Sequence, residues 1–337
     1  MRYTIVFAAA LVLVSPASGH HSNASMNRDS VLAFEGTITQ FNWRNPHVYF
    51  IVETTDERGE QVEWTIQTDS TNIRARRGWT RDSLASGDRV ALRAYPAQDG
   101  RQYALLISIE KEGGVVLRMA SDPLEVTAST PTLEGVWMAD ASKLVRYSGG
   151  LAGFFNAQLA MTESGAAAHA AFSERSDANP GTRCIGMPTP LTIVTTHLYP
   201  LEIQFNEDEE TIVIRSEFFD EERTVYMDGR GHPEGGDRLL AGHSIGWWDD
   251  EVLIVDTRNF ADHRSPYQSG VPSGAQKHVV ERYRLTEDGT RIAVEFLLED
   301  PEYLAEPLTH TRELVYSPHL VMSRYDCDPQ TTRRFLN

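Results

Sequence analysis

HVVERYRLTEDGTRIAVEFLL, residues 278–298, carries the clearest structural signal in this chain of 337 residues. Apolar and polar side chains alternate on both sides of Asp288-Gly289, and many of the apolar ones are β-branched or aromatic. This alternation is typical of strands with one buried face, and an Asp-Gly pair favours a tight turn. The stretch therefore predicts two antiparallel strands, at 278–285 and 291–298, joined as a hairpin.

Similar strand-like runs continue on both sides of this hairpin, and short polar turns join many of them. Regularly spaced antiparallel strands favour a closed barrel or a sandwich. We predict an up-and-down antiparallel barrel, or a sandwich, over residues 133–337, with one helical segment in the Ala-rich stretch 151–172. The remaining predicted strands lie at 133–138, 202–205, 211–217, 223–227, 243–248, 252–257 and 310–316.

The N-terminal part has a different order of elements. Three strand-like runs precede a helix-like stretch at 70–77, and two more follow it, which is the element order of the five-stranded OB barrel. We predict an OB-like β domain at 20–112 and a linker at 113–132, where glycine, proline, serine and threonine are frequent. The predicted strands lie at 34–41, 47–53, 61–67, 88–95 and 103–110.

Residues 1–19 have the pattern of a secretory signal peptide, with Arg2 before an apolar run and small residues up to Gly19. The apolar run is too short to span a membrane, and no later segment is long enough, so we expect no integral membrane segment. The predicted location is periplasmic or secreted. The formal net charge of −17 makes nucleic acid an unfavourable partner.

Two cysteines, Cys184 and Cys327, are present. An exported chain with an even and low number of cysteines more often pairs them than leaves both free. We therefore predict a disulfide that ties the C-terminal tail to the segment after Arg183.

Several motifs resemble a family of uncharacterised exported bacterial proteins. The resemblance implies an N-terminal domain of unknown function with HHS and NPH motifs, followed by a lipocalin-like domain with GHSIG and HVVER motifs. It implies no activity. The motifs are His20-His21-Ser22, Asn45-Pro46-His47, Gly242-His243-Ser244-Ile245-Gly246 and His278-Val279-Val280-Glu281-Arg282. Separately, Gly135-Val136-Trp137 resembles the Gly-x-Trp of lipocalin-type barrels, which implies a cup for apolar ligands.

The mature N-terminus is a candidate metal site. Cleavage after Gly19 makes His20 the first residue, so its amine and ring nitrogen can chelate one ion together. With His21 or His47 this gives a nitrogen-rich set of ligands that suits Cu(II). The alternative is adventitious binding by terminal histidines, and for His47 a hydrogen bond to the backbone after the Asn45-Pro46 turn.

The larger domain contains polar residues that interrupt apolar strands. Glu281 shares a strand face with Val279 and Tyr283, so it needs a buried partner such as His243, Arg223 or Arg230, or its pKa rises. Converging side chains of this kind can perform acid/base catalysis, bind zinc, or form a purely structural network. The catalytic candidates are Glu281, His243, His278, Asp256 and His232.

Three functions are compatible with these observations. The first is an exported protein that binds a small, largely apolar molecule in the barrel, with Trp247, Trp248, Tyr226 and Tyr283 lining the cavity. The second is an enzyme of the hydratase, cyclase or isomerase type that uses Glu281 and His243. The third is a copper-handling envelope protein that uses the N-terminal histidines.

Overall fold

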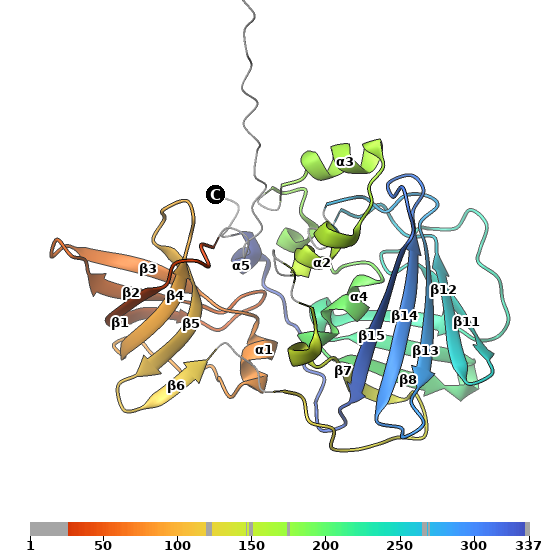
Figure 1. Cartoon of the computed structure of the whole chain (residues 1–337), viewed down its shortest axis with the longest axis horizontal. Helices are drawn as coiled ribbons and strands as arrows, with labels where there is room; N and C mark the ends of the chain where they lie inside the picture. The colour runs from red at the N-terminus through yellow and green to blue at the C-terminus, as the bar shows by residue number, and fades with distance from the viewer. Residues whose placement is uncertain are drawn as a thin grey trace, which may run out of the picture.

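A computed structural model describes residues 26–118, 123–145, 147, 151–173, 176–264, 268 and 270–333. The chain is mostly strands, arranged in an N-terminal and a larger C-terminal β unit (Figure 1). The predicted all-β fold class, with an OB-like barrel followed by a larger barrel, is confirmed.

The N-terminal unit is an OB-like barrel. Its sheet has the order β3-β2-β1-β4-β5-β6, and a parallel pairing of β3 with β5 closes the first five strands. Ile38, Phe50, Val52, Ile66 and Leu92 fill its core. The sixth strand, β6, lies in the segment predicted as linker. The elements are β1 (Leu32–Asn42), β2 (Tyr49–Thr55), β3 (Gln61–Gln67), α1 (Thr71–Arg76), β4 (Arg89–Pro96), β5 (Tyr103–Lys111) and β6 (Val115–Arg118).

The C-terminal unit is a closed barrel of nine strands in the order β10-β11-β12-β13-β14-β15-β7-β8-β9. Neighbours pair antiparallel except β10 and β11, which pair parallel. The strands are β7 (Gly135–Met138), β8 (Leu201–Asn206), β9 (Thr211–Ser216), β10 (Glu221–Tyr226), β11 (His243–Asp249), β12 (Val252–Arg258), β13 (His278–Leu285), β14 (Arg291–Glu299) and β15 (Leu308–Tyr316).

Short helices lie along one side of this barrel (Figure 1). The predicted helical segment is two helices, α2 (Leu151–Gln158) and α3 (Glu163–Ala170), and two more are α4 (Leu191–Val194) and α5 (Pro329–Arg333). None of the helices in the described ranges has the length and apolar character needed to cross a membrane. The 3-10 turns are Ala141–Lys143, Pro180–Arg183, Thr195–His197, Glu207–Glu209 and Phe218–Asp220.

Period-two alternation explains the barrel core. On β13, Val279, Glu281 and Tyr283 are buried, whereas Arg282 and Arg284 are exposed. Inward side chains fill much of the interior, so the barrel has a packed core. Trp137, from the Gly-x-Trp motif, is fully buried against Tyr316 and donates its indole N–H to the Leu133 carbonyl.

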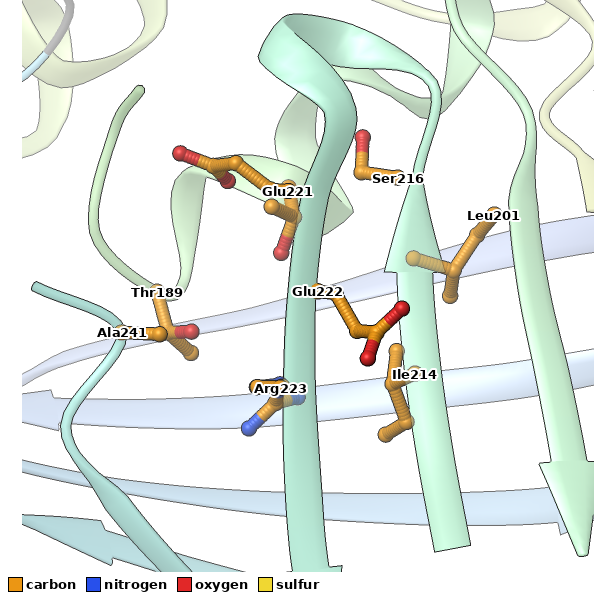
Figure 2. A pocket seen from close by; sticks show the side chains of 9 residues that line it. Thr189, Leu201, Ile214, Ser216, Glu221, Glu222, Arg223 and Ala241 are labelled. Atoms are coloured by element: carbon orange, nitrogen blue, oxygen red, sulfur yellow. The ribbon is translucent and has the colours of Figure 1, made fainter. Parts of the chain in front are cut away.

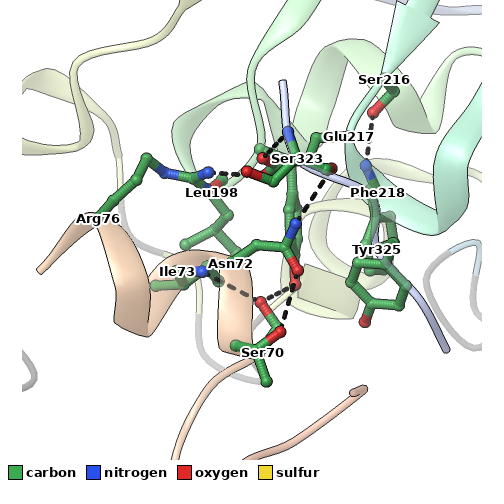
Figure 3. Close-up of polar contacts among 12 residues, drawn as sticks. Ser70, Asn72, Ile73, Arg76, Leu198, Ser216, Glu217, Phe218, Ser323 and Tyr325 are labelled. Atoms are coloured by element: carbon green, nitrogen blue, oxygen red, sulfur yellow. Dashed lines mark hydrogen bonds and ion pairs between the residues drawn. The ribbon is translucent and has the colours of Figure 1, made fainter. Parts of the chain in front are cut away.

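The C-terminal tail lies between the two barrels. Asn72 of α1 donates to the carbonyls of Ser323 and Arg324, and Asn45 donates to the Tyr325 carbonyl. Figure 3 shows the neighbouring contact, in which Arg76 binds the buried Glu217 carboxylate at 2.6 Å. The Asn45-Pro46 motif and α1 therefore hold the tail in place.

The predicted disulfide is confirmed. Cys184 and Cys327 are bonded, with a sequence separation of 143 residues. The bond fixes the tail to the segment that leads into α4.

Candidate functional site

A small pocket opens beside the first residues of β10 (Figure 2). Glu221 and Arg223 line it from one face of β10, because they are two residues apart on the same strand. The other walls come from β8, β9, the start of α4 and the segment before β11. Leu201, Ile214 and Ala241 supply its apolar residues, and the polar or charged lining residues are Thr189, Thr192, Ser216, Glu221, Glu222 and Arg223.

Glu221 is the most unusual titratable group of this pocket. Burial raises the pKa of its carboxyl to about 8, although the Met187 N–H and the Arg223 charge oppose the shift. Oε1 accepts the hydrogen bond from Met187. A Cβ on Gly186 would collide with this carboxylate, so glycine there allows the approach. At neutral pH the group is mainly a neutral acid that can donate a hydrogen bond.

Arg223 connects the pocket to a polar network inside the barrel. Its Nη2 lies 2.7 Å from Glu281 Oε1 and 3.2 Å from the Tyr283 hydroxyl. The Tyr283 hydroxyl donates to the same carboxylate oxygen at 3.1 Å. Glu281 is fully buried. Arg223 is thus the buried partner of Glu281, and it is one of the three partners that the sequence allowed.

The other four catalytic candidates converge elsewhere, on the outer face of the barrel. Asp256 of β12 accepts from His232 Nε2 and from His278 Nε2, each at 2.8 Å. His232 Nδ1 lies 3.0 Å from His243 Nδ1. His232 comes from the crossing between β10 and β11, and Asn259 anchors that segment by donating to the Pro233 carbonyl. The structure separates this cluster from Glu281, which faces inward.

Asp256 carries a negative charge in this cluster at neutral pH. Burial opposes ionisation of Asp256, but hydrogen bonds from His278 and His232 outweigh it and lower the pKa to about 2. Burial, with the neighbouring His232, lowers the pKa of His243. Asp256, His232 and His278 keep 16% exposure of their side chains, so solvent reaches them. Among the described residues, no group of three or more His, Cys, Asp or Glu side chains is arranged to hold a metal ion.

The predicted ligand-lining aromatic residues do not share one cavity. Trp247 and Trp248 are 46% and 47% exposed, near the hairpin that ends β11. Tyr226 stacks on His243 with ring centroids 5.2 Å apart, next to the outer cluster. Tyr283 alone is fully buried inside the barrel.

The predicted copper ligands are only partly described. His20 and His21 lie outside the described residues. His47 is partly buried, its Nδ1 lies 3.3 Å from the Thr68 carbonyl oxygen, and burial lowers its pKa. This contact is the backbone hydrogen bond that the structural interpretation of His47 predicts.

Sequence reasoning missed Glu221. The run Asp220-Glu221-Glu222 is typical of a solvated turn, and its charge suggests solubility. In the structure Asp220 accepts from the Tyr325 N–H at 2.7 Å, and Glu221 faces the pocket. The one feature that could have identified Glu221 is its position two residues before Arg223, which places both side chains on the same strand face.

Comparison with known proteins finds a match for the N-terminal part of the chain. Residues 9–106 match a family described as a family of unknown function (DUF6152). This agrees with the resemblance to an uncharacterised domain. No curated protein matches the chain.

Proposed function

We propose that the chain is an exported protein whose C-terminal barrel binds a small, largely apolar molecule in the pocket beside Glu221. The pocket itself is the observation that carries the proposal, since it places apolar surface beside polar and charged side chains that can orient a ligand. Leu201, Ile214 and Ala241 supply apolar surface, and Glu221 supplies one hydrogen-bond donor at neutral pH. The disulfide supports a periplasmic or secreted location.

The test is native mass spectrometry of the protein purified from its own host, followed by release and identification of any bound molecule. Ala241→Phe fills the pocket and should abolish the added mass. Ala293→Phe, at a partly exposed position on β14, is the matched control and should keep it. An unliganded wild-type barrel that takes up no apolar probe argues against the proposal.

An enzyme is a second candidate, and the pKa of Glu221 favours it. A carboxyl with a pKa of about 8 in a pocket can serve as a general acid at neutral pH. In this proposal Glu221 takes the place of the predicted catalytic pair. Glu281 and His243 face opposite sides of the barrel wall and therefore cannot act on one molecule together. Glu221→Gln should preserve binding of the molecule and abolish its conversion. Unchanged conversion by the variant would exclude Glu221 as the acid.

A further inference from the structure

Arg312 is a buried cation whose described surroundings contain no carboxylate partner. Its side chain is inward on β15, and the residue is 6% exposed. Nη2 donates one long hydrogen bond, of 3.4 Å, to the Val194 carbonyl. Nε is buried and has no hydrogen-bond partner. Buried guanidinium groups normally lie against an acid, because removing the charge from water is costly.

His310 is the second polar group at this position. It is two residues before Arg312 on the same strand, so both side chains share the inward face. Its Nε2 is buried and likewise has no partner. The ring packs against Phe154 of α2 and Phe296 of β14, with centroids 4.6 Å and 5.6 Å away. The His310 ring thus lies in an aromatic environment.

The charge of this cluster is well defined at neutral pH. Burial, followed by the Arg312 charge, lowers the pKa of His310 to about 4, and the same causes lower the pKa of His197 to about 4. Both histidines are therefore neutral. Burial lowers the pKa of Arg312 to about 10, which leaves it charged. The cluster carries a single positive charge.

We infer that Arg312 and His310 form a binding site for a small organic carboxylate with an apolar body. The single positive charge matches a monoanion, whereas a phosphate dianion would leave excess negative charge in a buried site. A carboxylate offers two acceptor oxygens, one for the guanidinium and one for the imidazole N–H. The aromatic rings of Phe154 and Phe296 suit the apolar body. His310 is partly exposed, so the site lies directly below the surface.

This site is separate from the pocket beside Glu221, and the inference does not rest on that proposal. Helix α4 lies between the two, because Thr192 lines the pocket and the Val194 carbonyl accepts from Arg312. A variant that fills one site should therefore leave the other intact.

The experiment is isothermal titration calorimetry of the full mature protein with benzoate and with benzyl alcohol, its neutral counterpart. Benzoate should bind the wild type, and Arg312→Met should weaken it by at least about tenfold, because a charge-assisted pair is lost. Benzyl alcohol should bind no better to the wild type than to Arg312→Met. Arg291→Met is the matched control, since Arg291 lies on β14 and pairs with Glu313 on the outer face.

Several other results would contradict the carboxylate site. Equal benzoate affinity for the wild type and Arg312→Met overturns the inference, as does the absence of benzoate binding to the wild type. Phosphate that binds as tightly as benzoate would contradict the carboxylate class. Ala241→Phe should retain benzoate binding, and its loss in that variant would place the anion in the other pocket.

Discussion

The C-terminal barrel contains two arginines that are buried equally and partnered differently. Arg223 is 7% exposed and Arg312 is 6% exposed. Arg223 contacts Glu281, Tyr283 and two hydroxyls, whereas Arg312 has one long bond to a carbonyl. A partner offsets part of the cost of burying a charge, whereas an unpaired buried charge costs stability in the absence of a ligand.

The pKa directions reflect the same difference. Burial opposes the charge of Arg223, but Glu281 outweighs it and raises the pKa of the guanidinium. Burial dominates at Arg312 and lowers the pKa there. The two pKa directions therefore follow from the presence of a carboxylate beside Arg223 and its absence among the described residues beside Arg312.

The disulfide links the C-terminal tail to the segment before α4. Replacing Cys184 and Cys327 by serine should lower the free energy of unfolding by about 4 kcal/mol, because the bond closes a loop of 143 residues. Urea unfolding of the double variant measures the loss, and reduction of the wild type should reproduce it. Equal unfolding midpoints with and without the bond would show that the tail is held by hydrogen bonds alone.

Breaking the paired site should also be costly. Arg223→Met leaves the Glu281 carboxylate buried without its partner, and we expect a loss of about 4 kcal/mol in urea unfolding. The double variant Arg223→Met with Glu281→Leu removes both charges and should regain most of this stability. If the single and double variants are equally unstable, the network contributes through packing and the comparison with Arg312 fails.

Glu221 should make the pocket beside Arg223 sensitive to pH. Its pKa is about 8 in the folded chain against an ordinary 4.5, so the folded state keeps a proton that the unfolded chain releases between these values. The stability from this group is fully present below the lower value and is lost as pH rises through the higher one.

The measurement is the difference in unfolding free energy between the wild type and Glu221→Gln from pH 4 to pH 9. The wild type should lose on the order of 3 kcal/mol relative to the variant as pH rises, with partial exposure reducing the effect. Parallel pH profiles for the two proteins would show that Glu221 titrates normally.

Periodicity predicted much of this fold but little of its sites. The alternation along 278–298 gave β13 and β14, and the element order gave the OB-like unit. It also placed Glu281 with Tyr283 on one face and allowed Arg223 as its partner. Alternation carries no information about the segment between β10 and β11, which brings His232 to Asp256.

The sequence also did not show which face of each strand points into the barrel. Trp247 was predicted to line the cavity, but it shares the outer face of β11 with His243, whereas Ser244 and Gly246 are buried. Glu221 was predicted in a turn, and nothing in the sequence singled out Arg312, yet the structure places Glu221 at the pocket and Arg312 on the inward face of β15. A single sequence does not tell which charged side chain folds inward, since that depends on the closure of the barrel by distant strands.

The smallest effect on stability should follow the removal of the unpaired charge. Arg312→Met deletes a buried guanidinium without leaving a buried carboxylate behind, so the apo protein should keep its stability or gain about 1 kcal/mol. Urea unfolding without added carboxylate measures this difference. A loss as large as that of Arg223→Met would mean that Arg312 is a structural cation after all. If Arg312→Met keeps its stability but loses benzoate binding, the two arginines have different roles: Arg223 stabilises the barrel, and Arg312 binds the carboxylate.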